Sequence, residues 1–133
     1  MVKAVIPYNQ DAHFDLISPW FKHYWGAYFP KEMIPTDGYI VYGEESGPLV
    51  AGFLYHTNSS IVWLEDIIGN PEADKAERKE GIAVLLQALE MRAKALGFKH
   101  VFTATAHANM IEYYKQAGFQ ADPIPHTLLI KGI

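Results

Sequence analysis

Residues 61–105 decide the fold, and they read IVWLEDIIGNPEADKAERKEGIAVLLQALEMRAKALGFKHVFTAT. The apolar run 61–68 ends at the turn sequence Gly69-Asn70-Pro71, as a buried strand does. A helix follows that ends at Gly97 and has one apolar face, formed by Ile82, Leu85, Leu86, Leu89, Ala93 and Leu96. Residues 100–105 then form a second strand. This order predicts two parallel strands with a long helix between them.

Shorter strands precede this unit. Residues 2–6, 38–43 and 49–56 have the composition of strands, and the turn-forming residues 44–48 predict that the last two pair as an antiparallel hairpin. The strand at 61–68 continues this antiparallel part. The sequence therefore predicts an α/β fold with a mixed sheet, antiparallel at its N-terminal strands and parallel across the long helix.

Three further elements complete the chain. Residues 11–28 carry apolar side chains near helical spacing, and Pro19 is expected to divide them into two short helices. Residues 109–117 are expected to form a short helix that Gly118 closes, and residues 126–131 a last strand. No repeat or low-complexity linker separates these elements, so residues 1–133 are expected to form one domain.

Composition excludes several classes of function. A formal net charge of -4 argues against general nucleic-acid binding, which depends on a basic surface. The absence of cysteine excludes disulfides, thiolate catalysis and cysteine zinc sites, and the six histidines show no paired spacing, so no metal site is expected. No apolar run approaches the ~18 residues that span a bilayer, and a signal peptide's longer apolar stretch is missing. We therefore expect no membrane partner and a cytoplasmic location.

Three local motifs follow one another along the chain. They read WLEDIIGNP at 63–71, RKEGIA at 78–83 and YYKQAGF at 113–119. The first is similar to the fourth strand of the GNAT superfamily of N-acetyltransferases, the second to its acetyl-CoA signature Gln/Arg-x-x-Gly-x-Gly/Ala, and the third to its Leu-Tyr-x-x-x-Gly-Phe ending. With the strands before them, the motifs cover residues 38–119. Their order and spacing imply the GNAT fold and the use of acetyl-CoA.

The resemblance implies where the coenzyme binds. Unpaired N–H groups at a helix N-terminus bind phosphate, and a glycine lets the pyrophosphate approach the backbone closely. The residues alone also fit an ordinary helix, capped by Asp74 with Glu77 as its capping-box partner. The coenzyme-binding residues that the resemblance implies are Ile67, Ile68, Arg78, Lys79, Gly81, Ile82, Ala83 and Asn109.

Two neighbouring carboxylates, Glu65 and Asp66, interrupt an otherwise apolar strand. On a regular strand Glu65 shares a face with Ile67, and Asp66 shares the opposite face with Ile68; a bulge, common in GNAT proteins at this point, would change these faces. A buried carboxylate needs a partner, so one of the two is expected to line a cleft or to pair with a Lys or Arg. The resemblance implies that Glu65 is the base that takes the proton of the acceptor amine.

The third motif supplies the matching acid. The resemblance implies that Tyr114 protonates the leaving thiolate of coenzyme A, and a phenol is suited to this because it is a weak acid and a hydrogen-bond donor. The alternative is that Tyr113 and Tyr114 are aromatic packing residues, and one of the two is expected to be. The dense aromatic residues between 8 and 29 are expected to be mostly core, some of them walling the acceptor pocket.

The function that follows is acetyl-CoA-dependent N-acetylation of a primary amine, carried by a small molecule or a peptide. Two alternatives stay open. The first is a GNAT-like module that binds coenzyme A or a protein partner without turnover, which the single glycine and Glu80 in the second motif favour. The second is an accessory protein that keeps the fold for stability only. The identity of the acceptor, and the choice between a monomer and a homodimer, are likewise open.

Overall fold

The computed structural model describes all 133 residues, and its strands form one five-stranded sheet in the order β1-β2-β3-β4-β5. The first four strands pair antiparallel, and β5 pairs parallel to β4. The mixed sheet that the sequence predicts is therefore confirmed. The strands are β1 (Val2–Pro7), β2 (Gly38–Gly43), β3 (Gly47–Tyr55), β4 (Ile61–Gly69) and β5 (His100–Phe102).

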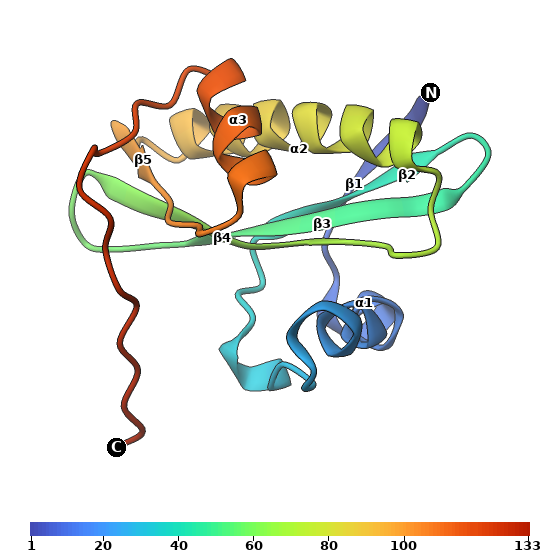
Figure 1. Cartoon of the computed structure of the whole chain (residues 1–133), viewed down its shortest axis with the longest axis horizontal. Helices are drawn as coiled ribbons and strands as arrows, with labels where there is room; N and C mark the ends of the chain where they lie inside the picture. Colours follow the sequence, from blue (N-terminus) through green and yellow to red (C-terminus); the bar gives the residue numbers. More distant parts are fainter.

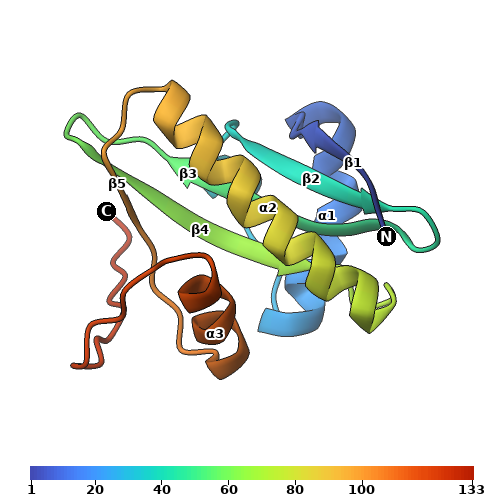
Figure 2. The same cartoon turned by 90° about the horizontal axis from the view of Figure 1, so that it is seen from above.

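Helices cover both faces of the sheet (Figure 1). Helix α1 (Gln10–Trp25) and the short 3₁₀ helix η1 (Lys31–Met33) lie on one face, whereas α2 (Lys75–Ala95) and α3 (Ala108–Gln116) lie on the other. Seen from above, α2 runs diagonally across the strands and α3 lies beyond β4 (Figure 2). The core is split by the sheet into an α2-side cluster, which includes Val50, Leu64, Leu85 and Leu89, and an α1-side cluster, which includes Ile17, Phe21, Ile40 and Phe53.

Helix α1 is continuous, so the prediction that Pro19 divides it is wrong. The side chain of Asn9 caps its start by accepting a hydrogen bond from the Ala12 N–H, and Gly26 ends it with a φ of 74°. Proline removes one helical hydrogen bond. The buried face of Ile17, Trp20 and Phe21 packs against the sheet on both sides of Pro19, and this burial stabilises the helix across the missing bond.

The C-terminal part of the chain differs most from the sequence prediction. Strand β5 ends at Phe102, three residues earlier than expected, because residues 103–105 no longer pair with β4. Residues 126–131 form no strand, so that prediction is wrong. A strand needs a neighbour for its backbone hydrogen bonds, and the chain after α3 runs away from the sheet (Figure 1). None of the helices is long and apolar enough to cross a membrane.

Candidate functional site

A β-bulge in β4 organises the site. Ala51 of β3 pairs with Ile68, and Phe53 pairs with Glu65, so two residues of β4, Asp66 and Ile67, lie opposite the single Gly52. Asp66 adopts a left-handed φ of 60°, the only non-glycine residue with positive φ. Aspartate tolerates this region better than most residues. The strand therefore changes the facing of its side chains at this point.

The bulge overturns the prediction made for a regular strand. Phe53 lies in the α1-side cluster, and Glu65, its antiparallel partner, shares that face. Ile68 is buried on the same α1 side, whereas Ile67 packs against the α2-side cluster. The prediction that Glu65 shares a face with Ile67 is therefore wrong, because β4 has one more residue than β3 between these two positions and its side chains change faces there.

Glu65 lies where β4 and β5 separate. The two strands pair only from Ile61 with His100 to Trp63 with Phe102. The segment that follows β5, beginning at Thr103, diverges from β4. Glu65 Oε1 accepts a hydrogen bond from the backbone N–H of Ala104 at 3.2 Å and makes no ion pair with a Lys or Arg. Burial raises the pKa of Glu65 to about 7, while the Ala104 N–H lowers it and the charge of Asp66 raises it. A carboxyl group with this pKa can accept and return protons near neutral pH.

Asp66 is held by a tyrosine that the sequence analysis did not single out. The Tyr55 hydroxyl donates a hydrogen bond to Asp66 Oδ2 and lies 2.9 Å from the Met33 carbonyl oxygen of η1. Burial raises the pKa of Asp66, and the hydrogen bond from Tyr55 lowers it. One phenol proton therefore serves two acceptors, and it ties η1, β3 and the bulge together on the α1 face.

Tyr114 lies on the α2 face, opposite Glu65, near the point where β4 and β5 separate. It is buried in the α2-side cluster, where its ring packs against Phe119 at 5.1 Å, and its hydroxyl accepts a hydrogen bond from Thr103 Oγ1 at 3.3 Å. Burial raises its pKa to about 12, and the charge of Glu65 contributes to this increase. Thr103 and Ala104 are consecutive, so Tyr114 and Glu65 contact neighbouring residues of one segment. The phenol stays protonated at neutral pH.

A pocket of 320 Å³ lies between α2 and α3. It brings together four of the predicted coenzyme-binding residues with three others, and the full lining is Lys75, Ala76, Arg78, Lys79, Ile82, Asn109 and Tyr113. Arg78 is also structural, since its Nη1 donates to the carbonyl oxygens of Asn70 at 2.9 Å and Ala73 at 3.4 Å. Lys75 and Lys79 are exposed, one helical turn apart, and carry the free positive charge of the pocket.

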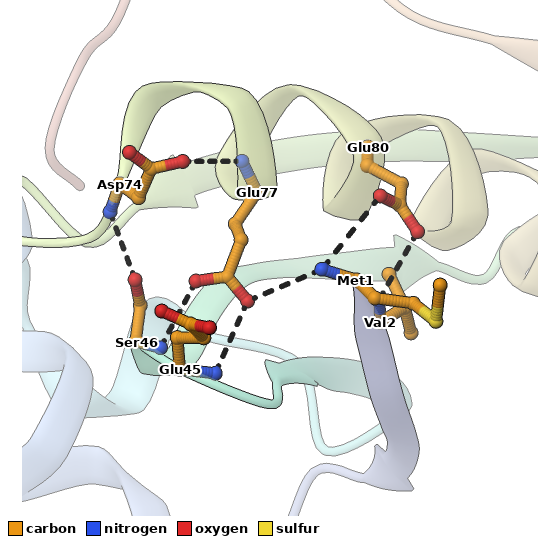
Figure 3. Close-up of polar contacts among 7 residues, drawn as sticks. All are labelled: Met1, Val2, Glu45, Ser46, Asp74, Glu77 and Glu80. Atoms are coloured by element: carbon orange, nitrogen blue, oxygen red, sulfur yellow. Dashed lines mark hydrogen bonds and ion pairs between the residues drawn. The ribbon is translucent and has the colours of Figure 1, made fainter.

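The N-terminus of α2 differs from the expected anion site (Figure 3). The helix begins at Lys75, so residues 78–83 lie inside it rather than at its start, and their N–H groups face the preceding turn. The Asp74 carboxylate caps the helix by accepting from the Glu77 N–H at 3.1 Å. Glu77 does not return this bond as in a capping box: its carboxylate accepts from the backbone N–H groups of Glu45 and Ser46. The Ser46 side chain lowers the pKa of Glu77 most, and these two backbone hydrogen bonds lower it further, whereas burial raises it.

The remaining predicted coenzyme residues are more dispersed. Gly81 faces the sheet, where a Cβ would lie 3.1 Å from Leu49 Cδ1, so it permits close packing of α2 on β3 rather than contact with a ligand. Ala83 is exposed on α2. Ile67 is the second residue of the bulge and Ile68 follows it, at the point where β4 and β5 have separated. No group of three or more potential metal-ligating side chains lies together.

Sequence reasoning missed Tyr55, Met33 and the backbone of Ala104. Tyr55 stands at the end of a strand, and nothing in its sequence context shows that a bulge brings Asp66 to it. Met33 and Ala104 take part through backbone atoms, which any residue type supplies. The sequence gives Tyr113 no role other than packing, yet Tyr113 lines the pocket between α2 and α3, whereas the adjacent Tyr114 is the buried one.

Comparison with known proteins identifies the fold. No protein-family model and no curated protein sequence matches the chain. Solved structures do match. One is a probable acetyltransferase, with a TM-score of 0.70 and 21% identity over 98% of this chain and 100% of that one. Another is a GNAT family acetyltransferase from Streptococcus pneumoniae, with a TM-score of 0.68 and 12% identity over 98% of each chain. A third is AAC(6')-Iy in complex with a bisubstrate analog, CoA-S-monomethyl-acetylneamine, TM-score 0.69 at 18% identity, also covering 98% of each. The chain has the fold of these acetyltransferases, which confirms the GNAT fold.

The Tyr55 hydroxyl is expected to stabilise the bulge. Tyr55→Phe removes the donor to Asp66 and leaves a partly buried acceptor without its partner, which costs about 1–3 kcal/mol. Urea unfolding should show this loss. Tyr39→Phe is the matched control, because the Tyr39 hydroxyl on the neighbouring strand β2 makes no hydrogen bond within the chain. Equal unfolding free energies for the two variants would show that the Tyr55 hydroxyl does not hold the bulge.

Proposed function

We propose that the chain is an acetyl-CoA-dependent N-acetyltransferase that transfers the acetyl group directly to a primary amine. One observation carries the proposal: within a GNAT fold, Glu65 lies at the separation of β4 and β5 with its pKa raised to about 7 and no basic side chain neutralising it. A carboxyl group buried in this way, in the absence of an ion pair, is typical of a proton-transfer site.

The pocket between α2 and α3 fits the coenzyme. Its cations, Lys75, Arg78 and Lys79, suit the phosphate groups of coenzyme A, and Asn109 and Tyr113 add polar contacts from α3. Support also comes from AAC(6')-Iy, whose structure contains a coenzyme A conjugate. The amides of residues 78–83 are used by the helix, so we assign the phosphate contacts to these side chains rather than to a backbone loop. The acetyl thioester would extend from this pocket toward the separated strands.

Two side chains would move protons during the transfer. The acceptor must attack as a neutral amine, and Glu65, on the α1 face, would take its proton. As the nitrogen–carbon bond forms and the carbon–sulfur bond breaks, the thiolate leaves, and Tyr114 would protonate it from the α2 face. The Ala104 N–H keeps Glu65 oriented, and Thr103 keeps Tyr114 oriented, so one segment of the chain positions both groups.

The α1 face would receive the acceptor. Glu65 and Asp66 give this face two carboxyl groups, which favours approach of a cationic amine. Helix α1 covers the face, and Tyr24 and Trp25 at its end and Tyr28 after it are exposed; such aromatic side chains contact the apolar part of a small molecule or peptide. The class of acceptor that fits is therefore a primary amine with an apolar neighbouring group.

One observation favours the non-enzymatic alternative, a GNAT-like module that binds coenzyme A without turnover. Asp74 caps α2 next to Lys75, and Glu80 follows Lys79 in the chain, although its carboxylate accepts from the Val2 N–H and pairs with the N-terminal amine, so each lysine of the pocket has an acidic neighbour in the chain. These charges weaken coenzyme binding without affecting Glu65. Binding and turnover are therefore tested separately.

Acetyl-CoA is expected to raise the melting temperature of the protein. A ligand that binds only the folded state stabilises it by about 2.7 kcal/mol at a hundredfold excess over Kd. Lys79→Ala should reduce this shift, since Lys79 lines the pocket without bracing the fold, and Lys94→Ala, an exposed lysine farther along α2, is the matched control. An unchanged melting temperature at millimolar acetyl-CoA would overturn the coenzyme assignment.

Turnover is expected to depend on Glu65 and on pH. Release of free thiol with a panel of primary amines measures it, and Glu65→Gln should lower kcat about 100- to 10,000-fold with little effect on coenzyme binding. Glu90→Gln, which changes an exposed carboxyl group on α2, is the control.

Only the deprotonated Glu65 carboxylate accepts a proton, so kcat/KM of the unsubstituted protein should rise with pH and level off above about 7. Tyr114→Phe should slow thiol release.

If Glu65→Gln retains full turnover and the pH profile shows no inflection near neutrality, Glu65 is not the base. Thermal stabilisation by acetyl-CoA without thiol release for any amine would instead favour the non-enzymatic module.

A further inference from the structure

A second pocket lies at the C-terminal end of α2, and none of its residues belongs to the site described above. It has a volume of 460 Å³, which is within the usual range of ligand-binding pockets. The end of β1, the turn before β2, the residue after β3 and the last turn of α2 form its wall. The full lining is Pro7, Tyr8, Thr36, Asp37, Gly38, Tyr39, His56 and Arg92.

This pocket is separate from the pocket between α2 and α3. Lys79 and Arg92 lie near opposite ends of α2, ~20 Å apart along the helix axis. The edge strand β1 lies on the side of α2 away from α3 (Figure 2). Tyr39 packs against the α2-side cluster, whereas Glu65 lies on the α1 face. A ligand at this place therefore leaves the proposed active site free, and the inference does not rest on the proposed function.

An arginine that is held by one nitrogen only is the main polar group of the pocket. Arg92 Nε donates to Asp37 Oδ1 at 3.2 Å and to Asp37 Oδ2 at 3.4 Å, which orients the guanidinium group. Its terminal nitrogens, Nη1 and Nη2, donate to no atom of the chain. The ion pair thus braces α2 against the start of β2 through Nε alone, and the outer edge of the guanidinium group is available to a further acceptor.

His56 lies on the other side of Asp37. Its Nε2 is 2.7 Å from Asp37 Oδ2, and its ring packs against Phe98 at 5.5 Å. The side chains of Arg92 and His56 are 41% and 46% exposed, whereas that of Asp37 is only 18% exposed. A ligand that enters the pocket therefore meets the donors of Arg92 and His56 before it meets the carboxylate of Asp37.

The shape and charge of the pocket define the chemical class of ligand. Pro7 and Tyr39 are partners on the antiparallel strands β1 and β2, so their apolar surfaces lie on one face, and Thr36 and Tyr39 add hydroxyl groups. The paired donors of a guanidinium group match the two oxygens of a carboxylate. Asp37 already offsets part of the positive charge, which favours a monoanion over a doubly charged phosphate. The volume exceeds what a carboxylate group alone would fill.

We propose that this pocket binds a small molecule that carries one carboxylate group on an aromatic or apolar body. The carboxylate accepts hydrogen bonds from Nη1 and Nη2 of Arg92, and the body lies against Pro7 and Tyr39. The Arg92–Asp37 ion pair holds the guanidinium group in place before the ligand arrives, so little side-chain freedom is lost on binding.

A nuclear magnetic resonance titration with benzoate tests the site. Benzoate should shift the backbone amide signals of residues 36–39 and 56 and the Nε–H signal of Arg92, with a Kd of about 1 mM for a ligand of this size. Two matched compounds separate the contributions: benzamide lacks the charge, and inorganic phosphate lacks the apolar body. Each should bind at least about tenfold more weakly than benzoate, because one of the two kinds of contact is lost.

Three variants locate the binding. Arg92→Lys keeps the charge beside Asp37 but cannot present two parallel donors, so it should weaken benzoate binding about tenfold. Lys94→Gln removes an exposed cation from the same turn of α2 and is the matched control, with an unchanged Kd expected. Tyr39→Ala removes the apolar surface without touching the Arg92–Asp37 pair, and it should also weaken benzoate binding.

Four results would overturn the proposal. The first two are the absence of any saturable shift at millimolar benzoate, and shifts centred on Lys75 and Lys79 instead of the residues around Arg92. The third is an unchanged Kd in both Arg92→Lys and Tyr39→Ala. The fourth is phosphate that binds as tightly as benzoate, since this would indicate an anion site in which the apolar surface takes no part.

Discussion

The bulge at Asp66 is the constraint on which the site depends. One extra residue in β4 opposite Gly52, directly after Glu65, turns Ile67 to the α2 face and Ile68 to the α1 face, just beyond the last residue pair that joins β4 to β5. A left-handed φ at a residue other than glycine costs of order 1–3 kcal/mol. The Tyr55 hydroxyl offsets part of this cost through its hydrogen bond to Asp66. Without the bulge, β4 would continue as a regular strand, and Asp66 would face α2 instead of contacting Tyr55 on the same face as Glu65.

The electrostatics of the site follow from this geometry. Glu65 is partly desolvated and receives only one backbone N–H, so its carboxylate is stabilised less than in water and its pKa rises. The positive charge of the chain lies elsewhere, on the first turns of α2, where Arg78 braces the preceding loop while Lys75 and Lys79 face the pocket. In the proposed function, proton transfer and phosphate binding would thus be separated along one path, from the α2–α3 pocket to the gap between β4 and β5.

The sequence predicted the sheet well because its signals are local: apolar runs, the turn residues of 44–48 and the apolar face of α2 each mark one element. It could not predict the facing of Glu65 and Asp66, because a one-residue bulge depends on the register of the partner strand. The resemblance placed residues 78–83 at a helix start, whereas the alternative that Asp74 caps the helix is confirmed, because Asp74 and Glu77 bind the loop at Glu45 and Ser46 and begin α2 one turn earlier. The sequence predicted a strand at 126–131 from composition, whereas a strand exists only where a neighbour pairs with it.

The central claim is that the bulge and the separation of β4 from β5 give Glu65 an elevated pKa in the folded protein. Nuclear magnetic resonance tests it most directly, by following the side-chain carboxyl carbon of Glu65 as pH is varied, with Glu65→Gln to identify the signal. The account predicts a titration midpoint of about 7. A midpoint near the ordinary value of 4.5 would contradict it, because Glu65 would then be solvated or paired with a cation instead of lying desolvated beside Ala104.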